Sequence, residues 1–295
     1  MAKPKISIIG PGVVGQAIGR LLKARRYPVA GVAGTSARKT HQAVAFIGGG
    51  RAARSPAAAA RGADVVFITT PDRMIRPVCE EIVEGGGLKR GAAVIHCSGA
   101  FGLELLEAAH SRKALTVALH PLQSFASPKA ALKRMKGTCF TFDGDEAAAE
   151  TVESIVSALG GRMLSISPQN RAVYHAATCV LSNYLVAIAD LGTILLKQSG
   201  LPEKEAVRAV RPLIEGTVEN IGAVGLPHAL TGPIARGDTE TVERHLQALA
   251  GFPYEIRRLY CELGLYTVRV AQRKGTLQAA DARHLVGILN NGLHR

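Results

Sequence analysis

Residues 5–15, Lys-Ile-Ser-Ile-Ile-Gly-Pro-Gly-Val-Val-Gly, predict a strand, a glycine turn and the start of a helix. The apolar or small residues Ile6–Ile9 indicate a short buried strand, and apolar residues recur at helical spacing from Val13 onward. Gly10, Gly12 and Gly15 lie between the two at G-x-G-x-x-G spacing. A strand, a glycine turn and a helix in this order are typical of a dinucleotide-binding βαβ unit.

Each glycine has a physical role in such a site. Gly10 would allow the tight turn, Gly12 the approach of a pyrophosphate to bare backbone, and Gly15 the close packing of helix and strand. The free N–H groups of the new helix would hold the phosphates. The predicted cofactor-binding residues of this loop are Gly10, Pro11, Gly12, Val13, Val14 and Gly15. The alternative is a tight turn that binds no ligand.

The second predicted strand, residues 28–34, carries information about the cofactor. An acidic residue at the end of this strand is typical of NAD sites, whereas here Thr35, Ser36 and Arg38 follow the strand. A hydroxyl and a guanidinium suit a 2′-phosphate, which Arg can bind with two hydrogen bonds. The sequence therefore favours NADP(H) over NAD(H). In the alternative interpretation, Ser36 only caps the next helix and Arg38 faces solvent.

Further apolar runs at residues 64–69, 92–96 and 115–119 predict more strands of a doubly wound parallel sheet. The loops after them should meet the cofactor at the carboxyl edge of the sheet. Thr70, Pro71 and Asp72 are thus added to the predicted cofactor site, with helix capping as the alternative role of Asp72. Two more strands and a helix complete an N-terminal Rossmann domain, residues 1–166.

From Ser167 onward the alternating pattern of strands disappears, which predicts an all-α C-terminal domain over residues 167–295. Residues 171–196 predict one long helix that is apolar nearly all round, so we expect it at the buried centre of that domain. Further helices are predicted at residues 203–222, 239–250, 254–273 and 279–290. The predicted class is α/β, with a Rossmann sheet followed by a helical domain.

Composition narrows the possible functions. The five cysteines are scattered without a C-x-x-C pair, which indicates reduced thiols in the cytoplasm and no metal site. The formal net charge is +13, yet no basic run is interleaved with aromatic residues, so we expect no nucleic acid. A small anionic substrate and a phosphate-rich cofactor account for part of this charge. No uninterrupted apolar run reaches membrane-spanning length and no signal peptide precedes the first strand, so no membrane association is expected.

Several polar side chains are candidates for catalysis and substrate binding. His175, Thr178 and Ser182 share one face of the predicted long helix, with Asn183 beside it. His175 is a candidate proton donor, with Ser182 and Asn183 orienting the substrate. The alternatives are a core histidine and a serine bonded to its own helix.

Three residues outside this helix complete the candidate site. His120, at a strand end, is the rival donor. Ser98 is a candidate substrate ligand or a turn residue, and Arg236 is the candidate partner of a substrate carboxylate.

Taken together, the chain resembles a superfamily that includes ketopantoate reductase, β-hydroxyacid dehydrogenases, pyrroline-carboxylate reductase and 6-phosphogluconate dehydrogenase. It resembles more closely a bacterial Rossmann-like family with a C-terminal domain of unknown function. The motifs that carry this resemblance are Thr70-Pro71-Asp72, His96–Ala100, His120–Phe125, Tyr174–Ala177, Ser182-Asn183-Tyr184 and Leu230–Asp238. The resemblance implies a helical domain like that of 6-phosphogluconate dehydrogenase and a homodimer. The catalytic lysine that ketopantoate reductase places on the long helix is missing, because the helix has Tyr174-His175 in that region.

These observations predict an NADPH-dependent reductase of a small anionic carbonyl compound, with 2-dehydropantoate (ketopantoate) as the first candidate substrate. One alternative is an imine reductase related to pyrroline-5-carboxylate reductase. The other is an NADP-binding sensor or scaffold without turnover.

Overall fold

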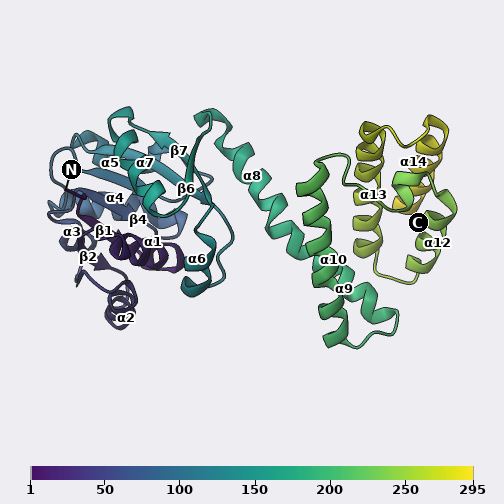
Figure 1. Ribbon diagram of the computed structural model, residues 1–295, viewed down its shortest axis with the longest axis horizontal. Helices are drawn as coiled ribbons and strands as arrows, with labels where there is room; N and C mark the ends of the chain where they lie inside the picture. Colours follow the sequence, from purple (N-terminus) through teal and green to yellow (C-terminus); the bar gives the residue numbers. More distant parts are fainter. Residues whose placement is uncertain (1, 295) are drawn as a thin grey trace. The chain divides into compact units, whose positions relative to one another are not determined.

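A computed structural model describes residues 2–294, which form two compact units (Figure 1). The first unit ends at Tyr184 and the second begins at Leu185. This division lies 18 residues beyond the predicted boundary after Ile166, because the helix that starts at Arg171 packs with the first unit.

The first unit is built on an eight-stranded sheet of order β3-β2-β1-β4-β5-β6-β7-β8. All neighbouring strands run parallel except β6 and β7, which are antiparallel. The strands are β1 Ile6–Ile9, β2 Val29–Ala33, β3 Arg51–Ala52, β4 Val65–Ile68, β5 Ala93–His96, β6 Leu115–Leu122, β7 Cys139–Gly144 and β8 Arg162–Ser165. The predicted doubly wound parallel sheet is therefore confirmed, with one antiparallel step near its edge.

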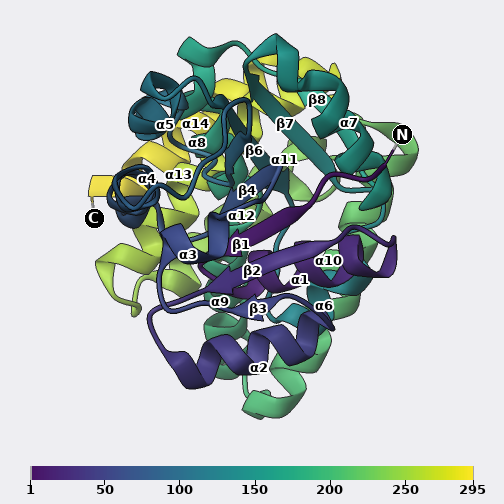
Figure 2. The same ribbon diagram turned by 90° about the vertical axis from the view of Figure 1, so that its left-hand side faces the viewer.

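Helices cover both faces of this sheet (Figure 2). One apolar layer contains buried residues of α1, α2, α6 and α7, and the other contains buried residues of α3, α4 and α5. The bounds are α1 Val13–Ala24, α2 Ala37–Ile47, α3 Pro56–Ala60, α4 Ile75–Glu84, α5 Glu107–Ser111, α6 Pro128–Arg134 and α7 Ala149–Ala158. Short 3₁₀ helices occupy Asp72–Met74, Leu103–Leu106, Glu146–Ala148 and Pro168–Asn170. Since both faces are covered, the strands β1, β4 and β5 are apolar runs rather than alternating ones.

The second unit is helical. Its elements are α9 Asn183–Gln198 (which begins just before the division), α10 Glu203–Val224, α11 Pro233–Arg236, α12 Thr239–Leu249, α13 Tyr254–Lys274 and α14 Ala279–His294. A core of buried residues from α11 to α14 includes Ile234, Val242, Val268 and Leu285. Breaks between these helices fall at the Gly-Leu-Pro and Gly-Phe-Pro segments, as the sequence predicts.

The expected single helix over residues 171–196 is wrong in two respects. It is divided into α8 Arg171–Leu181 and α9, because Ser182 leaves the helical φ range at −118°. It is also not a buried centre, since no residue of α9 is buried and Arg171 is the single buried residue of α8. The apolar composition therefore reflects exposed surface on this chain rather than its core.

Within residues 2–294, one helical stretch has the length and composition needed to cross a membrane. This is Pro168–Gln198, whose most apolar window has a mean hydropathy of 1.8 and no buried residue. The expectation of no membrane span rested on the lack of an unbroken apolar run. The mean hydropathy of this window is nevertheless high enough for a membrane-spanning helix, although polar residues interrupt it. A single such helix is weak evidence for a membrane protein, because helices of soluble proteins also reach these values.

Candidate functional site

The glycine loop has the geometry that its sequence predicts. Gly10 adopts a φ of +82°, and a Cβ placed on it would lie 2.5 Å from Cγ2 of Thr70. A Cβ on Gly15 would lie 2.3 Å from Oγ1 of Thr69 and 2.9 Å from Cγ2 of Ile8, so this glycine lets α1 approach the strands. A Cβ on Gly12, in contrast, would meet no other described atom within 4 Å. The backbone at Gly12 is therefore open on the side from which a phosphate can approach.

Two further observations fit a phosphate-bearing cofactor at this loop. Gly12 is the N-cap residue of α1 and supplies no side-chain cap, so the first N–H groups of the helix are available to an anion. Thr70 Oγ1 is buried and has no hydrogen-bond partner in the described chain. The side chains of Val13 and Val14 pack against the apolar core, which leaves their backbone N–H groups for binding. Pro11 approaches Gly34 and its carbonyl accepts a hydrogen bond from Gln16 Nε2.

The candidate 2′-phosphate residues lie at the beginning of α2. Ser36 is the N-cap of α2, and its hydroxyl accepts a 3.4 Å hydrogen bond from the Lys39 N–H. Thr35 and Arg38 are exposed. The capping alternative thus holds for Ser36, while Arg38 remains accessible to a ligand. Asp72 begins a 3₁₀ helix, and its carboxylate makes no hydrogen bond within residues 2–294, so its predicted capping role is not seen.

The loop after β5 is ordered by its own hydrogen bonds. His96 Nδ1 accepts from the Ser98 N–H at 3.1 Å, and its Nε2 lies 2.9 Å from the Gly102 carbonyl oxygen. Ser98 Oγ accepts from the N–H groups of Ala100 and Phe101, each at 3.2 Å. Ser98 therefore has the turn role that the sequence left as the alternative to substrate binding.

Three ring side chains meet at the carboxyl end of β5 and β6. His120 Nδ1 lies 2.7 Å from the hydroxyl oxygen of Tyr174 in the first turns of α8. The rings of His120 and His175 are 6.2 Å apart, edge to face. A Cβ on Gly99 would lie 2.7 Å from His175 Cδ2 and 3.0 Å from His120 Nε2, so the bare glycine backbone forms one side of this ring cluster. Both rival proton donors are thus brought together.

The environment of His120 disfavours its charged form. Burial lowers the pKa of His120 to about 4, and the positive charges of His175 and Arg171 act in the same direction. Burial also lowers the pKa of His96 and raises the pKa of the Tyr174 hydroxyl. His120 is consequently a neutral imidazole at pH 7, able to accept or donate one hydrogen bond at each nitrogen.

Sequence reasoning missed Arg171 and Asp143, which form a buried ion pair beside the ring cluster. Arg171 Nη2 lies 3.1 Å from Asp143 Oδ2, and the two side chains are 4% and 9% exposed. Arg171 Nη1 also donates to the Ser98 carbonyl oxygen at 3.4 Å. This pair joins the start of α8 to β7 and to the loop after β5. The signal available in the sequence was a lone Arg at the beginning of an apolar helix.

The remaining candidates are not part of this cluster. Thr178 donates its hydroxyl to the His175 carbonyl, and Asn183 is exposed. Ser182 ends α8 and makes no side-chain hydrogen bond within the described chain. Arg236 ends α11 in the second unit and is exposed, so its contact with a substrate stays a prediction. Asp238 caps α12 by accepting a hydrogen bond from the N–H of Thr241.

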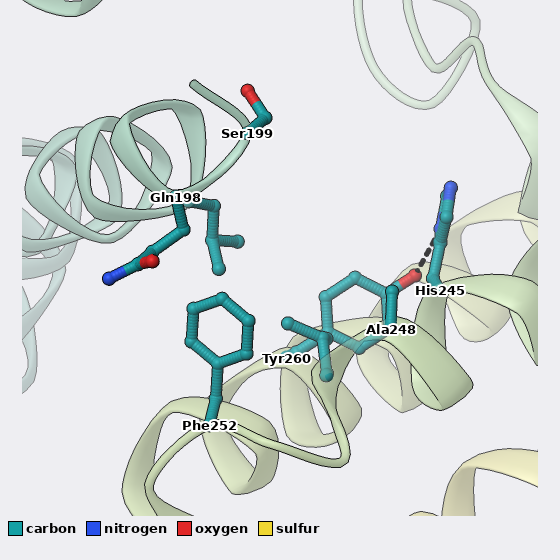
Figure 3. Close-up of a pocket in the computed structure, with 8 residues that line it drawn as sticks. Gln198, Ser199, His245, Ala248, Phe252 and Tyr260 are labelled. Atoms are coloured by element: carbon teal, nitrogen blue, oxygen red, sulfur yellow. Dashed lines mark hydrogen bonds between the residues drawn. The ribbon is translucent and has the colours of Figure 1, made fainter. Parts of the chain in front are cut away.

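The second unit contains a separate cavity of about 420 Å³ (Figure 3). Gln198 at the end of α9 and the following Ser199 lie on the opposite side of it from Phe252 and Tyr260, and Leu195 also lines it. The Tyr260 hydroxyl and His245 Nδ1 satisfy one another at 2.7 Å, so the cavity offers mainly apolar side chains. In the described residues no group of three or more His, Cys, Asp or Glu could hold a metal ion. The candidate reaction site is therefore the edge of the sheet in the first unit.

The fold and the glycine loop define a Rossmann-like dinucleotide-binding protein. Residues 1–121 match the Rossmann-like domain family, and residues 138–267 match the family described as Domain of unknown function (DUF2520). The chain therefore combines a Rossmann-like domain with a DUF2520 domain, which confirms the resemblance seen in the motifs. No curated protein matches the sequence.

Solved structures share this fold over nearly the whole chain. Protein TM1727 from Thermotoga maritima is 26% identical, with a TM-score of 0.71 over 90% of this chain and 99% of that one. BF3122 from Bacteroides fragilis, named as a candidate NADP oxidoreductase, is 22% identical. Its TM-score is 0.73 over 90% of this chain and 98% of that one. A pyrroline-5-carboxylate reductase from Coxiella burnetii is 17% identical, with a TM-score of 0.57 over 99% and 98%.

Proposed function

We propose that this protein is an NADP(H)-dependent oxidoreductase that reduces a small anionic carbonyl compound. One observation carries the proposal. The open backbone at Gly12 and the His120, Tyr174 and His175 ring cluster lie at the carboxyl ends of parallel strands in one sheet, where Rossmann folds bind cofactor and substrate. The names of two proteins that share the fold, an NADP oxidoreductase and a pyrroline-5-carboxylate reductase, agree with this reaction class.

The chain supplies binding and electrostatics for such a reaction. Bound NADPH would supply the hydride. The N–H groups at Gly12 and the start of α1 would hold the pyrophosphate, and Thr70 Oγ1 would find a partner on the cofactor. The ring cluster would supply polar hydrogen-bonding atoms where negative charge develops on the substrate.

Ketopantoate is the first substrate that we propose, and a cyclic imine carboxylate is the second, because a pyrroline-5-carboxylate reductase shares the fold. NADPH oxidation, followed by its absorbance with a panel of 2-oxo acids and cyclic imines, distinguishes them. We expect turnover with one class. Tight NADPH binding without turnover on either class would instead identify a sensor or scaffold.

The cofactor preference depends on Arg38. Replacing it with alanine should weaken NADPH binding by about tenfold or more and leave NADH binding nearly unchanged, because the guanidinium would bind only the 2′-phosphate. Fluorescence titration with both cofactors measures this. Arg90→Ala, an exposed cation before β5 at the opposite edge of the sheet, is the control. Equal losses for NADPH and NADH in Arg38→Ala would contradict the assignment.

We further propose a cytoplasmic homodimer that binds neither nucleic acid nor membrane. The homodimer is supported by exposed apolar side chains on α9 and α10, namely Leu185, Val186, Ile188, Val207, Leu213, Val218, Ile221 and Val224. Apolar surface of this extent marks an interface rather than a solvated face. A second copy of the chain could bury it, as the resemblance implies.

Charge on this surface should therefore weaken the dimer. Val186 is 70% exposed, so Val186→Asp should leave the fold intact and shift the chain toward monomer in sedimentation equilibrium. Gln272→Asp, on the exposed side of α13, should not. A monomeric wild-type chain, or one that sediments only with lipid vesicles, would contradict the homodimer.

A further inference from the structure

The ring cluster contains a phenol that is not among the proton donors predicted from the sequence. Tyr174 lies in the first turns of α8, and its hydroxyl oxygen is 2.7 Å from His120 Nδ1 on β6. The two rings meet edge to face with centroids 5.7 Å apart. Tyr174 is half-buried, whereas its helical neighbours Ala172, Val173, Ala176 and Ala177 are exposed. The Tyr174 hydroxyl thus lies in a fixed position within reach of a ligand at the sheet edge.

We propose that Tyr174 is the residue that donates the proton in this reduction, and that His120 is the positioning residue that holds its hydroxyl. The inference rests on the proposed function, since it names the proton donor of that same site. It replaces both histidines that the sequence offered for this role.

The charges around the pair favour a phenol over an imidazolium as the donor. His120 is partly buried on β6, between β5 and β7, and faces His175 and the Arg171 guanidinium on α8. Each positive charge opposes a second one on His120. Asp143 on β7 is already occupied by Arg171. The groups that face Tyr174 are His120, the Thr141 hydroxyl, Arg171 and the thiol of Cys139. A phenol is neutral when protonated, so it can donate its proton here without a further positive charge beside His175 and Arg171.

The reduction combines hydride addition to the substrate with proton transfer from Tyr174. Addition of a hydride to the carbonyl carbon moves the π electron pair onto the carbonyl oxygen. The Tyr174 O–H bond breaks, its proton bonds to that oxygen, and the phenolate keeps the O–H electron pair. His120, in the tautomer that carries its proton on Nδ1, donates the 2.7 Å hydrogen bond to the phenolate and can return a proton to it. As that proton passes to the phenolate, a solvent acid protonates Nε2, so His120 changes tautomer and no imidazolate forms.

Tyr174→Phe removes the hydroxyl and keeps the ring, and so tests the donor directly. We expect single-turnover NADPH oxidation, with ketopantoate or 1-pyrroline-5-carboxylate as probe, to fall about 100-fold or more. NADPH affinity by fluorescence titration should change less than about twofold, because the glycine loop follows β1 and adjoins Thr70 after β4, away from α8 in the sequence. Tyr266→Phe, at an exposed position of α13, makes the same chemical change and should leave the rate unaltered.

The pH profile separates a phenol from an imidazolium. An acid must be protonated to donate, so a tyrosine donor with a raised pKa predicts a rate that is flat from about pH 6 to 9. A histidine donor has a lower pKa than tyrosine and predicts a rate that falls as pH rises over the same range. His120→Gln, which can still hydrogen-bond the phenol, should keep more activity than Tyr174→Phe.

Histidine NMR titration gives a readout that needs no turnover. The proposal predicts that the His120 imidazole stays neutral down to about pH 5 and that its resonance, assigned with His120→Gln, shifts in Tyr174→Phe. A rate within about threefold of wild type in Tyr174→Phe, or a His120 that titrates near pH 6.5 regardless of Tyr174, overturns the proton-donor assignment alone. Absence of turnover with every carbonyl and imine probe overturns the proposed function and, with it, the donor role.

Discussion

Asp143→Ala is expected to lower the free energy of unfolding of the first unit by about 3–5 kcal/mol. The substitution leaves the Arg171 guanidinium, 4% exposed, without its carboxylate partner. Arg171 Nε already lacks a hydrogen-bond partner within residues 2–294, so no other described group replaces the lost contact. Because Arg171 also donates to the Ser98 carbonyl, the loop that carries Gly99 should loosen and activity should fall as well.

Chemical denaturation followed by circular dichroism measures this loss. The double variant Asp143→Ala with Arg171→Leu should recover much of the stability, since it removes the buried charge together with its partner. Glu205→Ala, which breaks an exposed ion pair with Arg208, should cost less than about 1 kcal/mol. A loss below about 1 kcal/mol in Asp143→Ala would mean that Arg171 is solvated in the folded state.

Two identical substitutions, three residues apart, should separate cofactor binding from folding. Gly12→Ala should weaken NADPH binding by about tenfold or more with little change in stability, because its Cβ meets no described atom but stands where a phosphate would lie. Gly15→Ala should instead destabilise the fold by about 1–3 kcal/mol, since its Cβ would lie 2.3 Å from Thr69 Oγ1 and 2.9 Å from Ile8.

Thermal unfolding with and without NADPH tests the pair. Gly12→Ala should unfold at the wild-type temperature when NADPH is absent and lose most of the stabilisation that NADPH gives. Gly15→Ala should unfold at a lower temperature in both conditions. If Gly12→Ala bound NADPH like wild type, the pyrophosphate would lie elsewhere on the chain.

Much of the first unit could be predicted because its signals are local. Ile6–Ile9 and Val65–Ile68 are short apolar runs bounded by turns, and both are fully buried strands. The turn expected at Gly10 and the close helix–strand packing expected at Gly15 are seen in the backbone, whereas the pyrophosphate contact at Gly12 stays a prediction. The two-residue strand β3 was missed because so short a segment has no period to detect.

Apolar composition alone led to a wrong expectation for residues 171–196. The pattern of apolar residues indicates that a helix has little polar surface, but it does not indicate what covers the apolar surface. In this chain the residues of α9 remain uncovered, and Ser182 interrupts the helix without a glycine or proline to announce it. Ser182 lies at the end of α8, and a shared functional face of His175, Thr178 and Ser182 stays a prediction.

The sequence by itself determined the Rossmann sheet, the glycine loop, the helical second unit and the presence of His120 and His175 at the site, because short-range patterns and strand ends specify these features. Only the tertiary structure decided which polar groups meet. The His120–Tyr174 contact joins residues 54 positions apart, and the Arg171–Asp143 pair joins residues 28 positions apart. Such contacts depend on how α8 packs against β6 and β7, and no local pattern encodes that packing.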